Sequence, residues 1–273
     1  MKTILKWTAC AACAVWTGAS ASAATETVKG ETVKGQNVIG LTTIKDDSRA
    51  YLPLAAAYTG TGATELTVAN IVQTATLAAG DELYAYDPGQ KQYDVYTLGK
   101  DGKWTAVKTV EVSASGTATE TTSPAAANRV ITCGRGFWIV RKADASREKP
   151  VRLVGNVPET AATVTIPEAA ADGKPSATLI GVPSDWNLNA NSTYWTKKAV
   201  RKDTIRVLND NDTTWREIVY DGTKWIEGIQ KVGENGTVTF EKNENPVLKG
   251  GYAVWYMRAG ETKFTLKLPE LPR

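Results

Sequence analysis

Two carboxylates, Asp101 and Asp221, occupy matching places in the two halves of this 273-residue chain and are the first candidates for chemistry. Two aspartates that share a proton, one contributed by each lobe, form the catalytic pair of aspartic-type peptidases. Neither residue lies in the Asp-Thr-Gly or Asp-Ser-Gly loop that marks such a peptidase. Each precedes a glycine instead, and Asp-Gly between strands is a strong signal for a hairpin turn. The pair is therefore a catalytic candidate that also has a purely structural interpretation.

Other carboxylates allow a glycosidase, which needs two carboxyl groups roughly 5 to 9.5 Å apart. The candidates by residue type are Asp94, Asp212, Glu217 and Glu227. The turn that contains Asp210 and Asp212 has oxygen ligands suited to calcium. It lacks the glycine and the spacing of an EF-hand loop, and Asn and Asp favour turns for local backbone reasons. We therefore predict a solvated turn there, with no metal site and no cofactor in the protein.

The chain contains no histidine. Ser-His-Asp and Cys-His catalysis in their usual forms are therefore excluded, as is histidine-ligated zinc. Cys133 is the one cysteine outside the first 24 residues, so thiolate metal clusters are excluded as well. As a nucleophile Cys133 would lack its usual base, and we expect it to be a small buried hydrophobic residue. An enzyme of this composition would be a hydrolase that uses Asp or Glu alone.

Aromatic side chains are the remaining candidates, because exposed Trp and Tyr rings can stack on sugars and other flat apolar surfaces. The chain has nine tryptophans. The strand expected at residues 134–141 is apolar on both faces, which predicts burial for Trp138. Trp186, Trp195 and Trp215 lie instead among Asn, Ser, Thr and Asp. We predict that these three tryptophans are exposed and contact the ligand.

Turns and runs of β-branched and aromatic residues predict the elements that must position these groups. Two strands are expected within residues 83–96, around a polar turn, and the turn at Asp101 leads into the next strand. Glycines lead into a further strand that ends at Arg141. Residues 64–74 allow one short helix, although their β-branched side chains disfavour it. The expected fold class is all-β.

The two halves share a layout that predicts an internal duplication. Matching positions are separated by a slowly drifting offset, as small insertions in loops would produce. Offsets of 130, 122, 122, 121 and 115 relate Leu52-Pro53 to Val182-Pro183, Asp81 to Asp203, Tyr93 to Trp215, Trp104 to Trp225, and Phe137 to Tyr252. In this alignment Ala253 replaces Trp138. We therefore expect two related domains, each a small β-sandwich or barrel.

The N-terminus has the features of a secretory signal peptide, namely Lys2 and Lys6, a short apolar core, and small residues up to position 24. The apolar run is about half of the 20 residues that a membrane span needs. Residues 1–24 are therefore expected to be removed on export to the periplasm, the outer surface or the medium. Their loss lowers the formal net charge from +3 to +1, which favours neither nucleic acid nor an anionic membrane as a partner.

Local composition predicts the remaining domain boundaries. A polar near-repeat punctuated by glycine indicates a flexible N-terminal arm at residues 25–37. Proline, alanine and glycine indicate a linker at residues 159–175. The first β domain is then expected at residues 38–158 and the second at residues 176–273.

The first half contains a Pro-containing strand, a hairpin with a central aromatic residue, an Asp-Gly-x-Trp turn at 101–104, a Gly-x-Gly-Phe-Trp strand at 134–138 and a closing Leu-Val-Gly at 153–155. This order resembles a β-rich repeat of exported bacterial proteins, a largely uncharacterised family. The second half departs from it, with Gly-Tyr-Ala at 251–253 and Leu-Lys-Leu at 266–268. The resemblance implies a β fold and export, and it transfers no catalytic residue.

These observations favour a secreted or envelope-associated, non-catalytic binding or structural protein that engages glycan or another protein. The alternative is a secreted, carboxylate-dependent hydrolase, an aspartic-type peptidase or a glycosidase, that acts on glycoprotein such as mucin. An exposed aromatic patch without nearby buried carboxylates would favour binding. Two carboxylates that face each other across a cleft would favour catalysis.

Overall fold

The computed structural model describes residues 25–27, 39–44, 49–60, 65–88, 90–112, 118–124, 129–142, 144–190, 198–210, 214–232 and 238–271. The described chain is almost entirely β-strand and turn, which confirms the predicted all-β class. Its helical segments are the four-residue α1 (Asp144–Arg147) and the 3-10 turn η1 (Thr74–Thr76). The predicted signal peptide, residues 1–24, lies outside the described residues.

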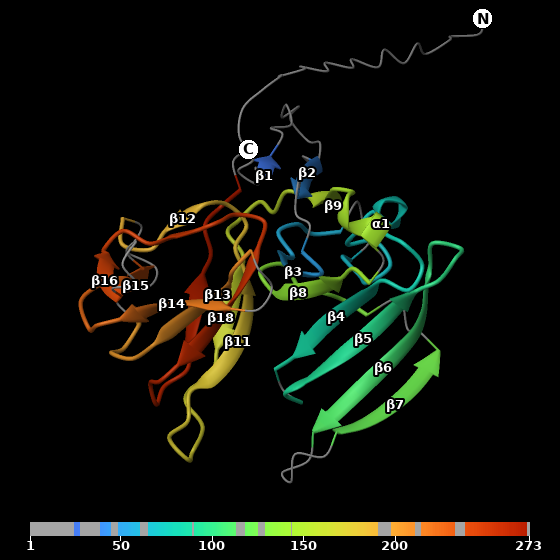
Figure 1. The fold of residues 1–273 in the computed structure, drawn as a ribbon. Helices are drawn as coiled ribbons and strands as arrows, with labels where there is room; N and C mark the ends of the chain where they lie inside the picture. Colours follow the sequence, from blue (N-terminus) through green and yellow to red (C-terminus); the bar gives the residue numbers. More distant parts are fainter. Residues whose placement is uncertain are drawn as a thin grey trace, which may run out of the picture.

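Six antiparallel strands form the large sheet of the first module, in the spatial order β3-β8-β4-β5-β6-β7. Their bounds are β3 Tyr51–Ala55, β4 Glu82–Asp87, β5 Gln92–Leu98, β6 Trp104–Val112, β7 Ala118–Pro124 and β8 Gly136–Val140. Strands β4 to β7 follow one another through hairpins, and β8 returns to insert between β3 and β4. Figure 1 shows this sheet on the right, in blue to green.

The second module has a large sheet with the equivalent order, β11-β18-β13-β14-β15-β16. Its strands are β11 Ser176–Gly181, β13 Thr204–Leu208, β14 Trp215–Tyr220, β15 Trp225–Val232, β16 Val238–Asn243 and β18 Ala253–Arg258. Each strand has a counterpart at the same place in the first sheet. The equivalence of order agrees with the predicted relation of the halves, while descent by duplication stays a prediction.

Smaller strand pairs complete each module. In the first module β2 (Ile39–Ile44) pairs with β9 (Val151–Asn156), and β1 (Thr25–Thr27) adds to the free side of β2. In the second module β10 (Thr163–Ile166) pairs with β19 (Phe264–Lys267), and β12 (Trp186–Asn187) pairs with β17 (Val247–Leu248). An isolated bridge between Thr67 and Val130 corresponds in the first module to the β12–β17 pair.

Each module buries a core between its large sheet and its small strand pair. In the first module (residues 39–156) Leu83 and Ile139 of the sheet belong to one apolar cluster with Leu153 of β9. In the second module (residues 163–267) Ile205 of the sheet clusters with Leu266 of β19. Alternation along the strands directs these side chains to one face. Two layers around one apolar core are the arrangement of a small β-sandwich.

Three predicted segments differ from the structure. The linker predicted at residues 159–175 contains β10, which pairs with β19. The short helix allowed at 64–74 does not form over its described part, where residues 65–73 make a β-bridge and turns. The start of the predicted flexible arm, residues 25–27, is strand β1, and residues 28–38 lie outside the described chain. In each case a partner distant in sequence decides the conformation, and local composition does not report it.

Strand register also corrects the alignment of the two halves. Leu83 pairs with Ile139, and Ile205, two residues after the equivalent buried aspartate, pairs with Tyr256. Trp138 therefore corresponds to Trp255, and the earlier match of Phe137 to Tyr252, with Trp138 replaced by Ala253, was wrong by two residues. By the same pairing Leu54 corresponds to Ile180, so Leu52-Pro53 and Val182-Pro183 are not equivalent. A shift of two residues preserves the in-and-out alternation of a strand, so the alternation alone does not reveal it.

Buried aspartates accept hydrogen bonds at the start of two equivalent strands, β4 and β13. Asp81 accepts hydrogen bonds from the backbone N–H of Ala78 and Lys142. Asp203 accepts the N–H of Ala259 and is contacted by the Arg258 guanidinium at 2.6 Å. Asp81, Asp203 and Arg258 are almost wholly inaccessible to solvent. These carboxylates have satisfied hydrogen bonds, which makes them structural.

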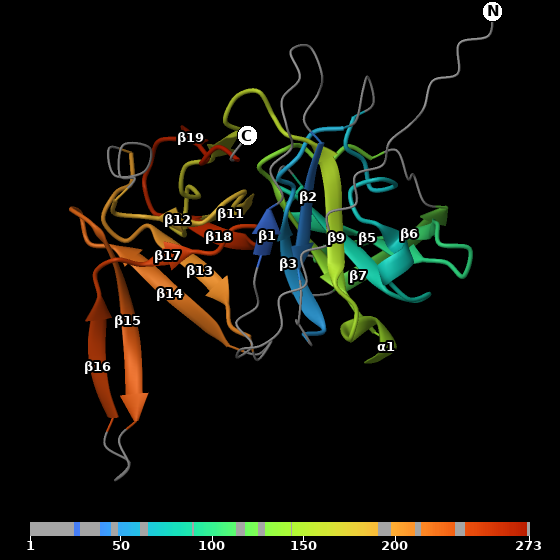
Figure 2. The same ribbon diagram turned by 90° about the horizontal axis from the view of Figure 1, so that it is seen from above.

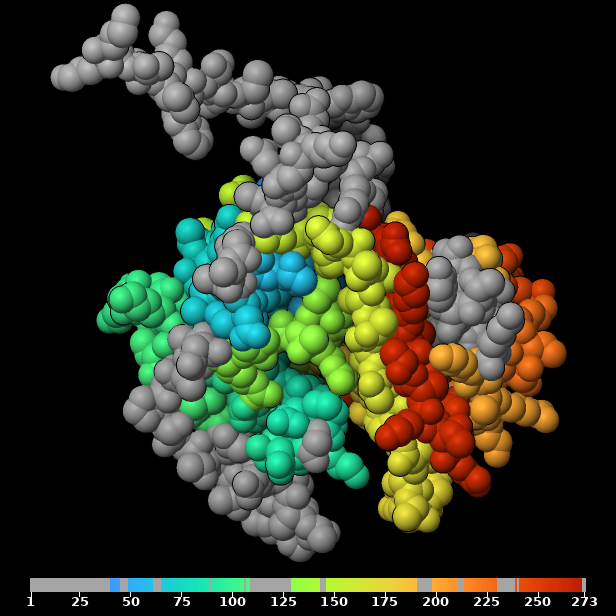
Figure 3. Space-filling model, turned by 180° about the vertical axis from the view of Figure 1, so that it is seen from behind, coloured from blue at the N-terminus to red at the C-terminus, as the bar shows by residue number. Residues whose placement is uncertain are grey.

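The two modules join through reciprocal backbone contacts in the middle of the molecule. The N–H of Ala55 donates to the Gly251 carbonyl at 3.0 Å, and at the equivalent place the N–H of Gly181 donates to the Gly134 carbonyl at 2.8 Å. Gly134 and Gly251 both have positive φ, 89° and 84°, which glycine adopts without strain. Figure 2 shows the modules side by side from above, and Figure 3 shows β11 in yellow between green and red segments.

Candidate functional site

The structure does not bring Asp101 and Asp221 together. Asp101 Oδ1 accepts the N–H of Lys103 at 3.1 Å, and Asp221 Oδ1 accepts the N–H of Lys224 at 2.9 Å. The two turns belong to different sheets, with β5 and β6 on one side of the molecule and β14 and β15 on the other (Figure 1). Backbone N–H groups of Lys224 and Thr223 lower the pKa of Asp221 to about 2. Each carboxylate shapes its own turn, as the structural interpretation of Asp-Gly expects.

The carboxylates considered for a glycosidase are also engaged locally. Glu217 is exposed and pairs with Arg206 at 2.7 Å. Glu227 is buried and lies 3.2 Å from the Arg216 guanidinium. Glu227 is paired with Ile218 across the sheet, so it projects from the face opposite to Glu217. These two glutamates therefore cannot flank one glycosidic bond.

The remaining acidic candidates do not form a described cluster. Asp94 makes an ion pair with Arg129. Asp210 lies 3.5 Å from Arg49, whereas Asp212 lies outside the described residues. Within the described part of the chain, no group of three or more His, Cys, Asp or Glu side chains is placed to hold a metal ion. The possibility of calcium at Asp210 and Asp212 stays untested.

The prediction of exposure has a different outcome for each of the three tryptophans. Trp186 is only 1% exposed and packs in the core of the second module, so its predicted exposure was wrong. Its polar neighbours in sequence belong to turns, while the pairing of β12 with β17 buries the ring. Trp195 lies outside the described residues. Trp215 is 42% exposed and opens onto a groove between the modules.

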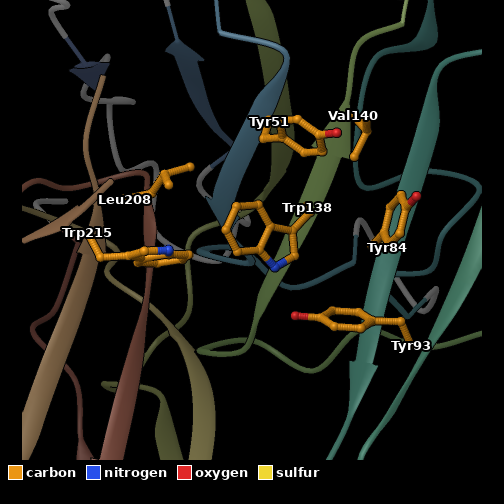
Figure 4. A pocket seen from close by; sticks show the side chains of 7 residues that line it. All are labelled: Tyr51, Tyr84, Tyr93, Trp138, Val140, Leu208 and Trp215. Atoms are coloured by element: carbon orange, nitrogen blue, oxygen red, sulfur yellow. The ribbon is translucent and has the colours of Figure 1, made fainter. Parts of the chain in front are cut away.

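This groove, here called the aromatic groove, has a volume of about 310 Å³. It is lined by Tyr51, Tyr84, Tyr93, Trp138, Val140, Leu208 and Trp215. Five of these seven side chains are aromatic, and none is a carboxylate. In Figure 4 Leu208 and Trp215 approach from the second module, and the other five from the first. The site therefore exists only where the two modules meet.

Alternation of the strands places the rings in the aromatic groove. Phe137 of β8 faces the core, so Trp138 faces the opposite side, where it is cross-strand partner to Tyr84 of β4. Trp138 meets Trp215 edge to face, with ring centroids 6.1 Å apart. Tyr84 meets Tyr93 in the same manner at 5.9 Å. Edge-to-face packing fixes the rings while leaving flat apolar faces for a ligand.

Polar groups of the groove lie at the edges of these rings. The Tyr84 hydroxyl donates to Glu82 at 2.9 Å, and Glu82 also accepts a 2.6 Å bond from Lys142. The Trp138 indole nitrogen is buried. Figure 4 shows it pointing toward the Tyr93 hydroxyl. Burial raises the pKa of Tyr93, against the effect of the nearby Trp138 N–H. Tyr93 is therefore a neutral hydroxyl at physiological pH.

Cys133 and the buried aspartates do not contribute to this site. Cys133 is half-buried, and burial raises the pKa of its thiol to about 11. A thiol with this pKa stays protonated at neutral pH and is a poor nucleophile. Burial and the neighbouring Asp203 raise the pKa of Tyr256, whose hydroxyl donates to Asp203 at 2.5 Å. Neither Cys133 nor the Tyr256–Asp203 pair lines the aromatic groove.

Sequence reasoning missed most of the aromatic groove. It identified Trp215, but it assigned Trp138 to the core because both faces of its strand are apolar. The available signal was the spacing of Tyr84, Tyr93 and Trp138, which places aromatic rings on strand faces opposite to smaller core residues. The spacing alone does not indicate a groove, because the other wall of the groove comes from the second module.

Comparison with protein-family models, with characterised proteins and with solved structures gives no match for this chain. No helix in the described part of the chain is long and apolar enough to cross a membrane. The function must therefore be inferred from the site itself.

Proposed function

We propose that this is an exported, non-catalytic binding protein that holds a glycan in the aromatic groove. The observation that carries the proposal is the groove itself, where exposed rings from both modules surround a hollow of about 310 Å³. Export rests on the signal peptide expected at residues 1–24 and on the motif resemblance to exported bacterial repeats.

A glycan fits the chemistry of the aromatic groove. Sugar rings present flat C–H faces that stack on Trp and Tyr, together with hydroxyl and ring oxygens that accept hydrogen bonds. The Trp138 indole N–H is buried beside the Tyr93 hydroxyl, so the ring of Trp138 offers the ligand a face and not a donor. The Tyr51 side chain, 49% exposed, adds a hydroxyl at the rim.

The surroundings of the groove support binding more than catalysis. Glu82 is a buried carboxylate that contacts the lining residue Tyr84, and its oxygens accept hydrogen bonds from Lys142 and from the Tyr84 hydroxyl. Hydrolysis of a glycosidic bond needs two carboxyl groups on either side of that bond. The lining of the aromatic groove supplies none.

The test is a glycan array with the mature chain, followed by calorimetric titration of the best ligand. Trp215→Ala should weaken binding about tenfold or more, because central tryptophans dominate such interfaces. Ile229→Ala is the matched control, since Ile229 is 39% exposed but does not line the groove. Both variants should unfold within a few degrees of the parent, because exposed side chains contribute little to stability. Glycan binding that Trp215→Ala leaves unchanged would refute the proposed site.

A further inference from the structure

The second module has an exposed ion pair where the first module has a ring of the aromatic groove. The register that matches Ile205 to Leu83 makes Arg206 the counterpart of Tyr84, which lines the groove. The Arg206 Nε atom lies 2.7 Å from Glu217 Oε1, and about half of each side chain is exposed to solvent. The two residues are direct cross-strand neighbours on β13 and β14. The Arg206–Glu217 pair therefore lies on the same face of its sheet as the groove does.

Aromatic residues connect this ion pair to the aromatic groove. Trp215 is two residues before the glutamate of the pair in β14, so the two side chains share a face and are about 7 Å apart along the strand. On the other side, Trp255 of β18 is the cross-strand neighbour of the arginine. The Trp255 ring packs on Tyr86 at 5.0 Å, and Tyr86 packs on the groove residue Tyr93 at 5.2 Å. A ligand that leaves the groove along β14 therefore meets the ion pair next.

Charged side chains beside the lining residues are balanced on both walls of the aromatic groove. The lining itself carries no charged side chain. In the first module Glu82 is two residues before Tyr84, and it accepts a 2.6 Å bond from the Lys142 ammonium. In the second module Arg206 and Glu217 balance each other in the same way. Such walls attract neither acids nor bases over a distance, which favours a neutral ligand.

The Arg206–Glu217 pair keeps most of its hydrogen-bonding groups available. A guanidinium carries five N–H donors and a carboxylate accepts at both oxygens, whereas the pair uses one nitrogen and one oxygen. Within the described residues neither side chain makes a further hydrogen bond. The available groups are donors beside an acceptor. Two neighbouring sugar hydroxyls match them, because each hydroxyl both donates and accepts.

We propose that the aromatic groove takes a neutral glycan and that Arg206 and Glu217 determine which one, by binding two neighbouring hydroxyls of a sugar held beside Trp215. This inference rests on the proposed function and adds the charge of the glycan and the residues that select it. An acidic sugar fits less well, because its carboxylate would be repelled by Glu217 or would compete with Glu217 for the guanidinium.

The experiment titrates the mature chain with four hexasaccharides in a calorimeter. Cellohexaose, mannohexaose and xylohexaose are neutral, and hexagalacturonic acid is the acidic probe. The best neutral hexasaccharide should bind at least about tenfold more tightly than the acidic one. Glu217→Gln and Arg206→Gln should each weaken its binding about tenfold, as expected for lost hydrogen bonds to charged groups. Glu244→Gln is the matched control, because Glu244 makes an equally exposed ion pair with Lys224, at 2.8 Å, and does not line the groove.

A deoxy sugar separates recognition of hydroxyls from a structural role of the ion pair. A form of the best neutral hexasaccharide that lacks one of two neighbouring hydroxyls on each ring should bind less tightly to the parent chain. It should bind the parent and Glu217→Gln within about twofold of each other, because the variant has already lost that contact. A structural role would weaken the binding of both sugars equally.

The outcomes distinguish this inference from the proposed function. Unchanged binding of the neutral hexasaccharide by both Arg206→Gln and Glu217→Gln would overturn the role of the ion pair and leave glycan binding in place. Tighter binding of hexagalacturonic acid, or an array on which only acidic glycans bind, would overturn the neutral ligand. If no glycan binds at all, the proposed function fails as well. Thermal unfolding should shift by only a few degrees in all three variants, because exposed ion pairs contribute little to stability.

Discussion

The aspartates of this protein have two structural roles, which differ in burial and in the groups that donate to them. Asp81 and Asp203 are buried and accept hydrogen bonds from segments distant in sequence, so they hold elements together. Asp101 and Asp221 are exposed and accept N–H groups two or three residues further along, so they shape turns. None of these roles requires catalysis, although Asp101 and Asp221 had the sequence positions of a catalytic pair.

The lowered pKa of Asp221 predicts that the stability of the folded protein depends on pH. Its pKa is about 2 in the folded chain and about 3.9 in an unfolded one. A lowered folded pKa means that the stabilisation is fully present above about pH 4 and is lost as the pH falls through about 2. Asp221→Asn should therefore be less stable than the parent at pH 5, and the difference should disappear near pH 2. Denaturant unfolding between these pH values measures it, and a difference that is constant with pH would contradict the prediction.

At the scale of elements, the junction between modules depends on close approach of backbones. A Cβ atom at Gly181 would lie 2.7 Å from the Arg135 carbonyl oxygen and 2.9 Å from the Ala55 Cα. A Cβ atom at Gly136 would lie 2.6 Å from Ala253 Cβ. Such distances are shorter than van der Waals contact, so these glycines let β3, β8, β11 and β18 meet.

Gly181→Ala should therefore destabilise the protein by about 1 to 3 kcal/mol, the usual effect of forcing extra atoms into a packed site. It should also weaken ligand binding, because the added methyl separates the two walls of the aromatic groove. Gly228→Ala is the matched control, since a Cβ atom at Gly228 in β15 meets nothing within 4 Å. Its stability should stay within about 0.5 kcal/mol of the parent. Chemical denaturation of both variants tests this, and equal effects would show that the junction is not tightly packed.

At the scale of the whole molecule, the two modules share parts of one core. Tyr252 of the second module and Leu271 near the C-terminus belong to the apolar cluster of the first module. The isolated bridge between Leu54 and Tyr252 pairs the modules at the same place. Separation of the modules would therefore expose apolar surface and unpaired backbone groups together.

We expect the protein to unfold in a single cooperative transition. The loss of the second module would remove Tyr252 and Leu271 from the core of the first, so forms with one module unfolded should be poorly populated. Far-ultraviolet circular dichroism and tryptophan fluorescence should give coincident denaturation curves, and the calorimetric enthalpy should equal the van't Hoff enthalpy. Two separate transitions would show that the modules are thermodynamically independent.

The sequence by itself determined the features that arise from contacts between near neighbours. It predicted the all-β class, the hairpin turns at Asp101 and Asp221, and the correspondence of Asp81 with Asp203, because turn chemistry and strand alternation are local. It also identified Trp215 as exposed. These signals need no knowledge of which strands pair.

Tertiary structure decided which aromatic rings reach solvent and which are buried. Trp186 was predicted to be exposed and is buried by the β12–β17 pair, whereas Trp138 was predicted to lie in the core and lines the aromatic groove. Neighbouring side chains of a strand point to opposite faces of the sheet. Whether each face is buried or exposed depends on strands that are far away in the sequence. The candidate site was inaccessible to sequence reasoning for this reason, since its two walls, at Trp138 and Trp215, come from different modules.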